Sequence, residues 1–233
     1  MRHLVLFTLT VLLHNSLIIA QTRRSIRVKA GEDIAQAYSP QGFYRFPLFS
    51  KATLFFKGGG HNSWHRFNYN ILSGTMQFIN PAGETLHIDA PESIDSVVFE
   101  KNVFVHNDGF MEVVAQTDSI MLLKKIIIKT REEKIGSLGL PAQSASIDNI
   151  SIYSADINVY NFIINADVVV TETVYWYWMD KNNKILKATK VNLLKLLPAG
   201  RQSTAETYLK QNKINFENET DLKELVANLA GQK

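Results

Sequence analysis

Short apolar runs separated by turn residues recur along most of this chain, and they restrict it to a mainly β fold. Between residues 43 and 129, turn signals return about every 8–12 residues, a spacing typical of antiparallel β proteins. These signals are Gly58-Gly59-Gly60, Asn80-Pro81-Ala82-Gly83, Ala90-Pro91-Glu92, Glu100-Lys101-Asn102 and Asn107-Asp108-Gly109. The pattern predicts a barrel- or sandwich-like antiparallel sheet of short strands within an α+β chain.

Two of the predicted strands have informative side-chain patterns. In residues 64–72, apolar and polar residues alternate, which predicts a strand buried on one face only. Residues 126–128 are three isoleucines flanked by Lys125 and Lys129. This run predicts a core strand whose basic flanks oppose edge-to-edge association.

The last part of the chain changes from strand period to helical period. Residues 191–197 predict a short helix that ends before Pro198. Ser203 and Glu206 have the spacing of a capping box, which predicts a second helix from 203 to about 210. Asn218 is expected to cap a third helix that is apolar on one face. We expect a C-terminal pair of short amphipathic helices that folds back onto the sheet or onto itself.

Composition also suggests how the chain is divided. A charged stretch rich in Gly and Ser at 130–151 predicts a surface loop, after which strands resume at 157–164 and 168–179. Residues 21–42 predict a flexible or edge-paired N-terminal arm. The expected parts are a signal peptide at 1–20, the arm at 21–42, a β domain at 43–189 and a helical tail at 190–233.

The N-terminus has the features of a secretory signal peptide. Arg2 and His3 precede an apolar run at 4–13, and Ala20 precedes the polar Gln21. A transmembrane anchor needs about 20 apolar residues, and the interruption at 14–16 leaves too few. We expect cleavage near Ala20 and export to the periplasm, the cell surface or the medium. No later segment predicts a transmembrane helix.

Cysteine content and net charge exclude two further possibilities. The chain has no cysteine, so it has neither disulfides nor the lipid-attachment cysteine of a bacterial lipoprotein. Removing residues 1–20 removes one arginine, which leaves 24 basic and 22 acidic side chains. That near-neutral balance argues against a nucleic-acid partner, whose binding domain would be strongly basic.

His61 and His65 are the strongest metal-site hypothesis. They are four residues apart, which is ligand spacing on a helix. Here they follow a triglycine turn that enters a predicted strand, and no acidic residue completes an HExxH motif. Solvent-facing histidines in a loop are the favoured interpretation, and metal analysis of the purified protein tests it. No cofactor is expected.

Aromatic residues supply the other candidate binding site. The run Tyr175-Trp176-Tyr177-Trp178 has two tyrosines on one strand face and two tryptophans on the other. One pair is expected in the core. The other pair either stacks against a sugar or is covered by the C-terminal helices, and coverage by the helices is favoured. Trp64 is a further candidate for sugar binding.

Motifs for catalysis are missing from the sequence. There is no GxSxG nucleophile elbow and no cysteine, and the triglycine is not followed by the Lys-Ser/Thr of a phosphate-binding loop. We therefore assign no catalytic residue.

Several stretches resemble a family of uncharacterised exported proteins from Gram-negative bacteria. They are Phe43-Tyr44-Arg45-Phe46-Pro47, Phe67-Asn68-Tyr69-Asn70, Met76-Gln77-Phe78-Ile79, Gly83-Glu84-Thr85-Leu86, residues 208–216 and residues 221–225. The resemblance spans most of the chain after residue 20. It implies a bacterial envelope location and a similar architecture, but no activity.

These observations rank three functions. The first is a non-enzymatic envelope protein that binds another envelope component or stabilises an assembly. The second is a carbohydrate-binding module that uses Trp64 or one face of the strand at 175–178. The third is an enzyme with a dispersed site. The expected partners are therefore another envelope protein or a polysaccharide.

Overall fold

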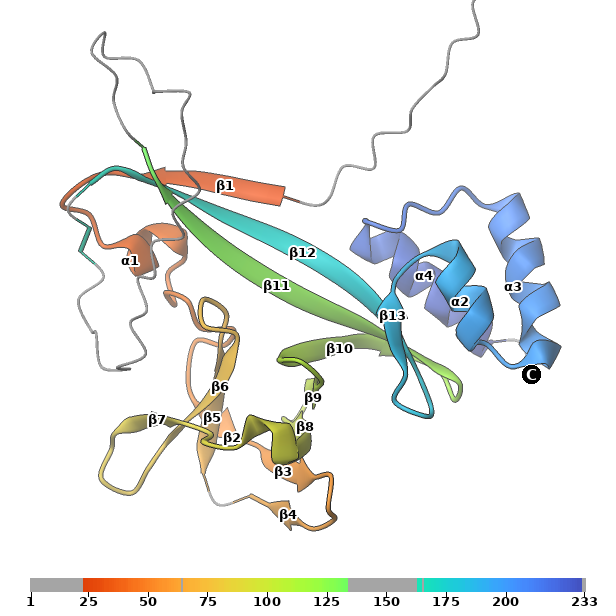
Figure 1. Ribbon diagram of the computed structural model, residues 1–233, viewed down its shortest axis with the longest axis horizontal. Helices are drawn as coiled ribbons and strands as arrows, with labels where there is room; N and C mark the ends of the chain where they lie inside the picture. The colour runs from red at the N-terminus through yellow and green to blue at the C-terminus, as the bar shows by residue number, and fades with distance from the viewer. Residues whose placement is uncertain (1–22, 64, 134–162, 165, 232–233) are drawn as a thin grey trace, which may run out of the picture.

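Two antiparallel sheets and a group of C-terminal helices make up the fold, which confirms the predicted mainly β class (Figure 1). The computed structural model describes residues 23–63, 65–133, 163–164 and 166–231. Both sheets are open, and no closed barrel forms in this part of the chain. The predicted signal peptide at 1–20 lies outside the described residues.

The large sheet has the order β1-β12-β11-β10-β9-β8-β3-β4, and β13 pairs with β12. Its strands are β1 (Arg23–Val28), β3 (Thr53–Phe56), β4 (His61–Asn62), β8 (Ile94–Val98), β9 (Val103–His106), β10 (Phe110–Gln116), β11 (Ile120–Glu132), β12 (Val168–Asp180) and β13 (Ile185–Lys187). β11 and β12 contain 13 residues each and pair along their whole length. With β1 they form a long arm that reaches from α1 to the C-terminal helices (Figure 1).

Local turn signals predicted two hairpins of this sheet correctly, β8–β9 and β9–β10. β8 and β9 are joined across Glu100-Lys101-Asn102, where the Phe99 amide donates to the Asn102 carbonyl at 2.8 Å. β9 and β10 are joined by a turn in which Asp108 and Gly109 have φ of 48° and 95°. β11 continues to Glu132, slightly beyond its predicted end. The predicted loop beyond 133 and the predicted strand at 157–164, apart from 163 and 164, lie outside the described residues.

The small sheet has the order β2-β5-β6-β7, and its central strand corrects one prediction. Its strands are β2 (Ser50–Lys51), β5 (Arg66–Asn70), β6 (Thr75–Ile79) and β7 (Thr85–His87). Asn68 and Asn70 are 1% and 3% exposed, so β5 is buried on both faces rather than on one. The preceding segment covers the polar face, because the Asn68 amide bonds to both backbone groups of Phe46, at 3.1 and 2.8 Å. These bonds replace the water that the polar face was expected to contact.

The helices begin and end mostly as their capping residues predicted. They are α1 (Ile34–Tyr38), α2 (Lys190–Leu196), α3 (Ala199–Gln211) and α4 (Glu219–Ala230), with a 3₁₀ turn η1 at Pro91–Ser93. Thr189 caps α2, which ends before Pro198, and the Asn218 side chain caps α4 by accepting from the Asp221 amide at 3.1 Å. None of the described helices has the length and apolar character needed to cross a membrane.

The predicted capping box of α3 is wrong. α3 begins at Ala199, directly after Pro198, so Ser203 lies inside the helix and its carbonyl accepts a bond from the Thr207 hydroxyl at 2.9 Å. Pro198 has a fixed φ of −56° and no amide hydrogen to leave unpaired, so it suits a helix start better than Ser203, five residues later, would. Ala205 is the only buried residue described for α3, whereas α4 buries four apolar residues.

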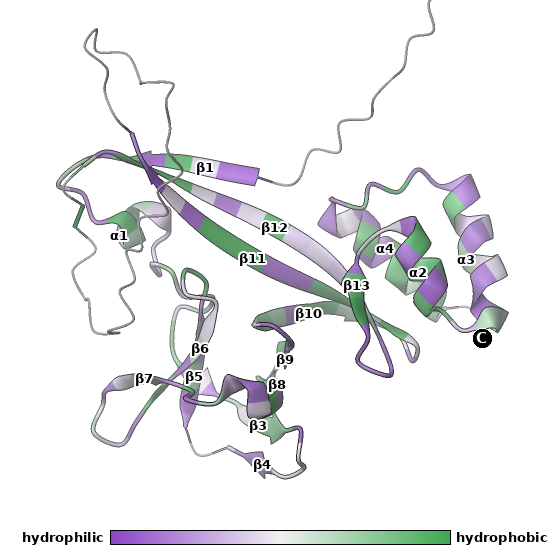
Figure 2. Cartoon of the chain, viewed as in Figure 1, coloured by the Kyte–Doolittle hydropathy of each residue, from purple (hydrophilic) through white to green (hydrophobic). Residues whose placement is uncertain are grey.

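The large sheet has a covered face and an open face. The covered face carries Trp176 and Trp178 under α2 and α4, and Val168 and Val170 under α1. In Figure 2 the helices of this side are banded with hydrophobic and hydrophilic residues, as amphipathic elements should be. The open face carries Tyr175 and Tyr177, and no described helix packs on it. Side chains alternate between the two faces along a strand, so the strand register shows for each residue of the arm whether it lies on the covered or the open face.

Candidate functional site

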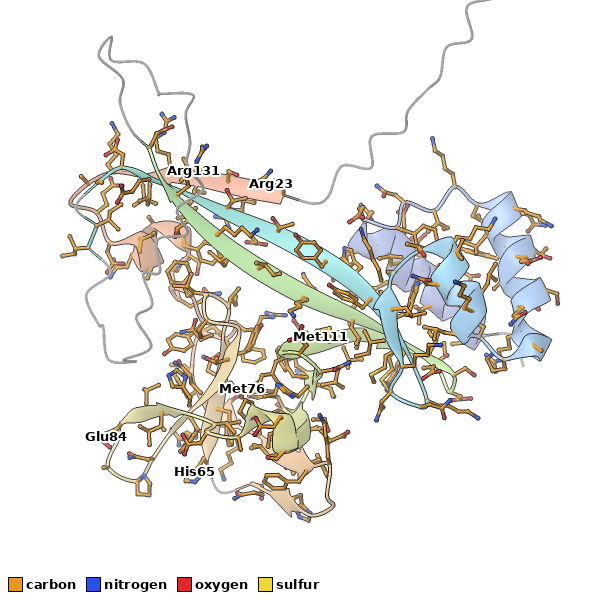
Figure 3. All side chains as sticks on the ribbon, in the orientation of Figure 1. Arg23, His65, Met76, Glu84, Met111 and Arg131 are labelled. Carbon is orange, nitrogen blue, oxygen red and sulfur yellow. The ribbon has the colours of Figure 1, made fainter. Side chains whose placement is uncertain are left out.

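A cavity of about 430 Å³ lies where β10 separates from β11, and we call it the intersheet pocket. β10 pairs with β11 only from Met121 to Lys124, whereas β11 stays paired with β12 as far as Glu132 (Figure 1). The small sheet closes the other side of the opening. The apolar lining consists of Tyr69, Ile71, Leu72, Met76, Ile88, Phe110 and residues 126–128, and the polar lining includes Ser73, Thr75, His106, Asp108 and Lys125. Figure 3 labels Met76, which contributes from the small-sheet side.

The hairpin between β5 and β6 forms one rigid rim of the pocket. The Asn70 carbonyl oxygen Oδ1 accepts from the amides of Leu72 and Ser73 at 3.0 and 3.2 Å. Gly74 has φ of +68° and closes the turn, a conformation that favours glycine. The hydroxyls of Ser73 and Thr75 lie 2.6 Å apart. The turn therefore holds two hydroxyl groups at the rim before any ligand is present.

A buried network of polar side chains lies next to this rim. The Tyr44 hydroxyl donates to Gln77 Oε1 at 2.8 Å, and Gln77 Nε2 lies 3.3 Å from His87 Nδ1. An amide nitrogen only donates, so His87 Nδ1 accepts, and in the neutral ring the proton is on Nε2. Among the described residues, Nε2 of His87 is buried without a partner. The network fixes the positions of Thr75 and β6 next to the pocket.

The turn between β9 and β10 forms the opposite rim. Lys125 Nζ donates to the Asp108 carbonyl at 2.7 Å, which ties this turn to β11. The His106 ring packs on Phe110 with centroids 4.8 Å apart. Burial, and then the charge of Lys57, lower the pKa of His106, so its imidazole is neutral near pH 7. In the part of the chain that the structure describes, its Nδ1 is buried and has no hydrogen-bond partner.

A buried ion pair anchors the base of β10 to the small-sheet side. Arg45 Nε and Nη2 each donate to the Glu112 carboxylate at 2.9 Å, and Asn102 Nδ2 donates to the same carboxylate at 2.9 Å. The Glu112 side chain is 7% exposed. This bidentate pair holds in place the strand whose departure from β11 opens the pocket.

The buried Tyr69 hydroxyl makes the free energy of unfolding depend on pH in the alkaline range. Its ring is 5% exposed, and burial, with a smaller contribution from the Glu112 charge, raises its pKa to about 12. The proton is therefore bound more tightly in the folded state, so this stability is fully present below pH 10 and is lost as pH rises through 12. Between pH 9 and 11.5 we expect the wild type to lose about 2 kcal/mol relative to Tyr69→Phe in urea unfolding. If the wild type and Tyr69→Phe lose the same stability over this pH range, the assignment is wrong.

The two predicted metal-ligand histidines pack against different aromatic neighbours. His61 is exposed on β4 and its ring lies 5.9 Å from Phe55, whereas His65 packs on Phe78 at 4.9 Å. No group of three or more His, Asp or Glu side chains suited to a metal ion occurs in the described part of the chain. Each ring instead packs against an aromatic neighbour of its own.

The tyrosines and tryptophans of β12 lie on opposite faces, as the strand period predicted. The C-terminal helices cover the tryptophans and no described helix covers the tyrosines, so the coverage expected for the second pair is not found in the described chain. Trp176 and Trp178 are 3% and 0% exposed in the core under the helices, so neither offers a ring to solvent. Tyr175 and Tyr177 are half-buried on the open face. Burial, together with the neighbouring Tyr175 and Asp108, raises the pKa of Tyr177. Trp64 lies outside the described residues.

Sequence reasoning missed the intersheet pocket. The sequence pattern marks Lys125 only as a basic flank of a core strand, and it does not indicate that His106 lies near it. These two residues lie together only because β10 separates from β11, and no short sequence pattern indicates that separation. No known protein family, curated protein or solved structure matches this chain.

Proposed function

We propose that this chain is an exported, non-enzymatic envelope protein that binds an extended segment of another envelope protein in the intersheet pocket. The observation that carries the proposal is the uncovered edge of β11 inside the pocket. No described residue forms a strand pair with residues 125–128 on the side away from β12. The signal peptide and the family resemblance support the envelope location.

An uncovered strand edge presents backbone N–H and C=O groups that pair readily with another strand. Residues from both faces of β11, such as Ile126 and Ile127, line the pocket, so the cavity runs along the strand edge itself. Four residues of edge extend about 13 Å, enough for a short added strand. In strand addition, the backbone bonds supply affinity and side-chain pockets supply specificity.

The surroundings of this edge distinguish it from the outer edge of the large sheet at β1. β1 lies at an outer edge and carries Arg23, Arg24 and Arg27, and charges of this kind discourage pairing with another chain. The pocket edge has three consecutive isoleucines between its basic flanks Lys125 and Lys129, and the apolar Ile71 and Phe110 lie beside them. We therefore expect the bound segment to be extended, with apolar side chains at alternate positions.

Selection from a displayed library of linear peptides tests the proposal. We expect the immobilised protein to enrich peptides rich in β-branched and aromatic residues, and Ser73→Trp to weaken their binding about tenfold or more by filling the rim. Methylating backbone nitrogens at alternate positions of a selected peptide should also weaken binding about tenfold, because each lost hydrogen bond contributes about 1 kcal/mol.

Leu86→Trp is the matched control, because Leu86 is 39% exposed on β7 of the same small sheet and does not line the pocket. Its peptide affinity should equal that of the wild type. Enrichment of no peptide, or binding that Ser73→Trp leaves unchanged, would reject the pocket as the site. Equal binding of the methylated peptide would reject strand addition.

A further inference from the structure

The open face of the arm carries two rows of cations with hydroxyl groups between them. Arg23 and Arg27 on β1 form one row, and Lys125, Lys129 and Arg131 on β11 form the other, as the register of both strands with β12 shows. Figure 3 labels Arg23 and Arg131 on this arm. Two strand spacings separate the rows, a distance of about 10 Å. We call this surface the cationic trough.

Side chains of β12 form the base of the trough. Thr171 and Thr173 are each 9% exposed between the longer side chains of the two rows, and the Ser25 and Thr171 hydroxyls lie 3.2 Å apart. Tyr175 lies opposite Lys125 at one end and is half-buried. The trough therefore combines cations at its sides, hydroxyls along its base and one aromatic ring at its end.

The charge of this surface is strongly one-sided even though the whole chain is close to neutral. The acidic residues of β11 and β12, which are Glu132, Glu172 and Asp180, occupy positions of the opposite parity and so belong to the covered face. Glu133 follows β11 directly and pairs with Arg27 at 2.6 Å. Arg23, Lys129 and Arg131 are exposed, and no described acid forms an ion pair with them.

We infer that the cationic trough binds an acidic polysaccharide that lies along β12. The two rows place positive charge on both sides of a linear polyanion, which is the arrangement that electrostatic complementarity requires. Hydroxyl groups at the base are suited to hydrogen bonds with sugar hydroxyls. The Tyr175 ring offers an apolar surface with a polar tip at one end of the path that the polysaccharide would follow.

The same features fit a membrane surface less well. Proteins that bind at a lipid interface insert large apolar or aromatic side chains into it. The large apolar residues that are well exposed in the described chain are Leu48, Phe55, Leu86, Ile163 and Val191, and none of them belongs to β1, β11 or β12. The trough therefore has the charge for an anionic lipid surface but lacks the anchors.

Binding of a short polygalacturonate oligosaccharide to the full mature protein tests this inference. We expect saturable binding that weakens as salt is raised, because the cations are solvent-exposed. The double variant Lys129→Glu, Arg131→Glu should weaken it about tenfold, because it replaces two exposed cations of one row with anions. Tyr175→Phe should retain binding and Tyr175→Ser should weaken it, because phenylalanine keeps the ring.

Lys181→Glu combined with Lys184→Glu makes the same charge change on the exposed turn between β12 and β13, away from the trough. An equal loss in this control would show non-specific attraction and overturn the inference. Equal binding of neutral dextran would overturn it too, as would binding to phosphatidylglycerol vesicles without binding to polygalacturonate. Both charge variants change only exposed side chains, and their unfolding curves verify that they fold.

Discussion

Replacing Trp178 by alanine is expected to lower the free energy of unfolding by about 3–5 kcal/mol, the range measured for large aromatic side chains in protein cores. Trp178 is fully buried on β12, in the same cluster as Leu193 of α2 and Leu225 of α4. Its Nε1 donates to the Thr189 carbonyl at 3.3 Å, and Thr189 caps α2. The substitution leaves a cavity and removes the bond that joins the sheet to the start of the helices.

Urea unfolding followed by far-UV circular dichroism measures this loss. Tyr175→Ala is the matched control, because it removes an aromatic ring from the same strand on the open face, where the ring is only half-buried. We expect it to lower stability by about 1 kcal/mol, as is usual for a partly exposed position. If the two variants lose the same amount, the helices are not held on the sheet by Trp178.

Features specified by neighbouring residues could be predicted from the sequence. The positive φ of Asp108 and Gly109, the cap at Asn218 and the stop at Pro198 each depend on a few consecutive residues. The separation of tyrosines from tryptophans on β12 follows from the period of a strand. The predicted start of α3 was wrong for a local reason as well. Pro198 and Ser203 are both residues that favour a helix start, and sequence alone does not rank them.

Strand order was beyond prediction because it depends on contacts between distant segments. β1 pairs with β12, which begins more than a hundred residues later, and β3 pairs with β8 across the inserted small sheet. The burial of Asn68 was missed for the same reason, since it required the Phe46 backbone to cover β5. Strand propensity reflects packing against such neighbours more than any intrinsic preference.

Both candidate binding surfaces arise from this long-range order. The cationic trough exists because β1 and β11 flank β12, which brings Arg23 and Lys129 to the same face from distant parts of the chain. The net charge of the chain does not indicate the trough, because the acidic residues that balance these cations lie elsewhere. Similarly, Lys125 reaches the intersheet pocket only because β10 leaves β11 after pairing with Lys124.

Arg45→Ala is expected to destabilise the protein by about 3 kcal/mol, because among the described side chains it leaves the buried Glu112 carboxylate with Asn102 as its remaining donor. Removing one partner of a buried pair leaves an uncompensated charge, which costs more than the intact pair contributes. The Arg45 side chain is 37% exposed, so water reaches the cavity that it leaves, and the loss should fall at the lower end of the range for such pairs.

The double variant Arg45→Ala, Glu112→Gln separates the effect of charge from that of packing. Glutamine has nearly the shape of glutamate and still accepts from Asn102, but it has no charge to leave unpaired. If the unpaired charge causes the loss, the double variant should recover about half or more of it in urea unfolding, giving a clear coupling energy in the double-mutant cycle. A double variant no more stable than Arg45→Ala would mean that the arginine acts through its contacts, including its position 5.3 Å over the Phe46 ring. In that case the pair would not be what holds β10 away from β11, and the pocket would depend on the packing of residues 43–47 instead.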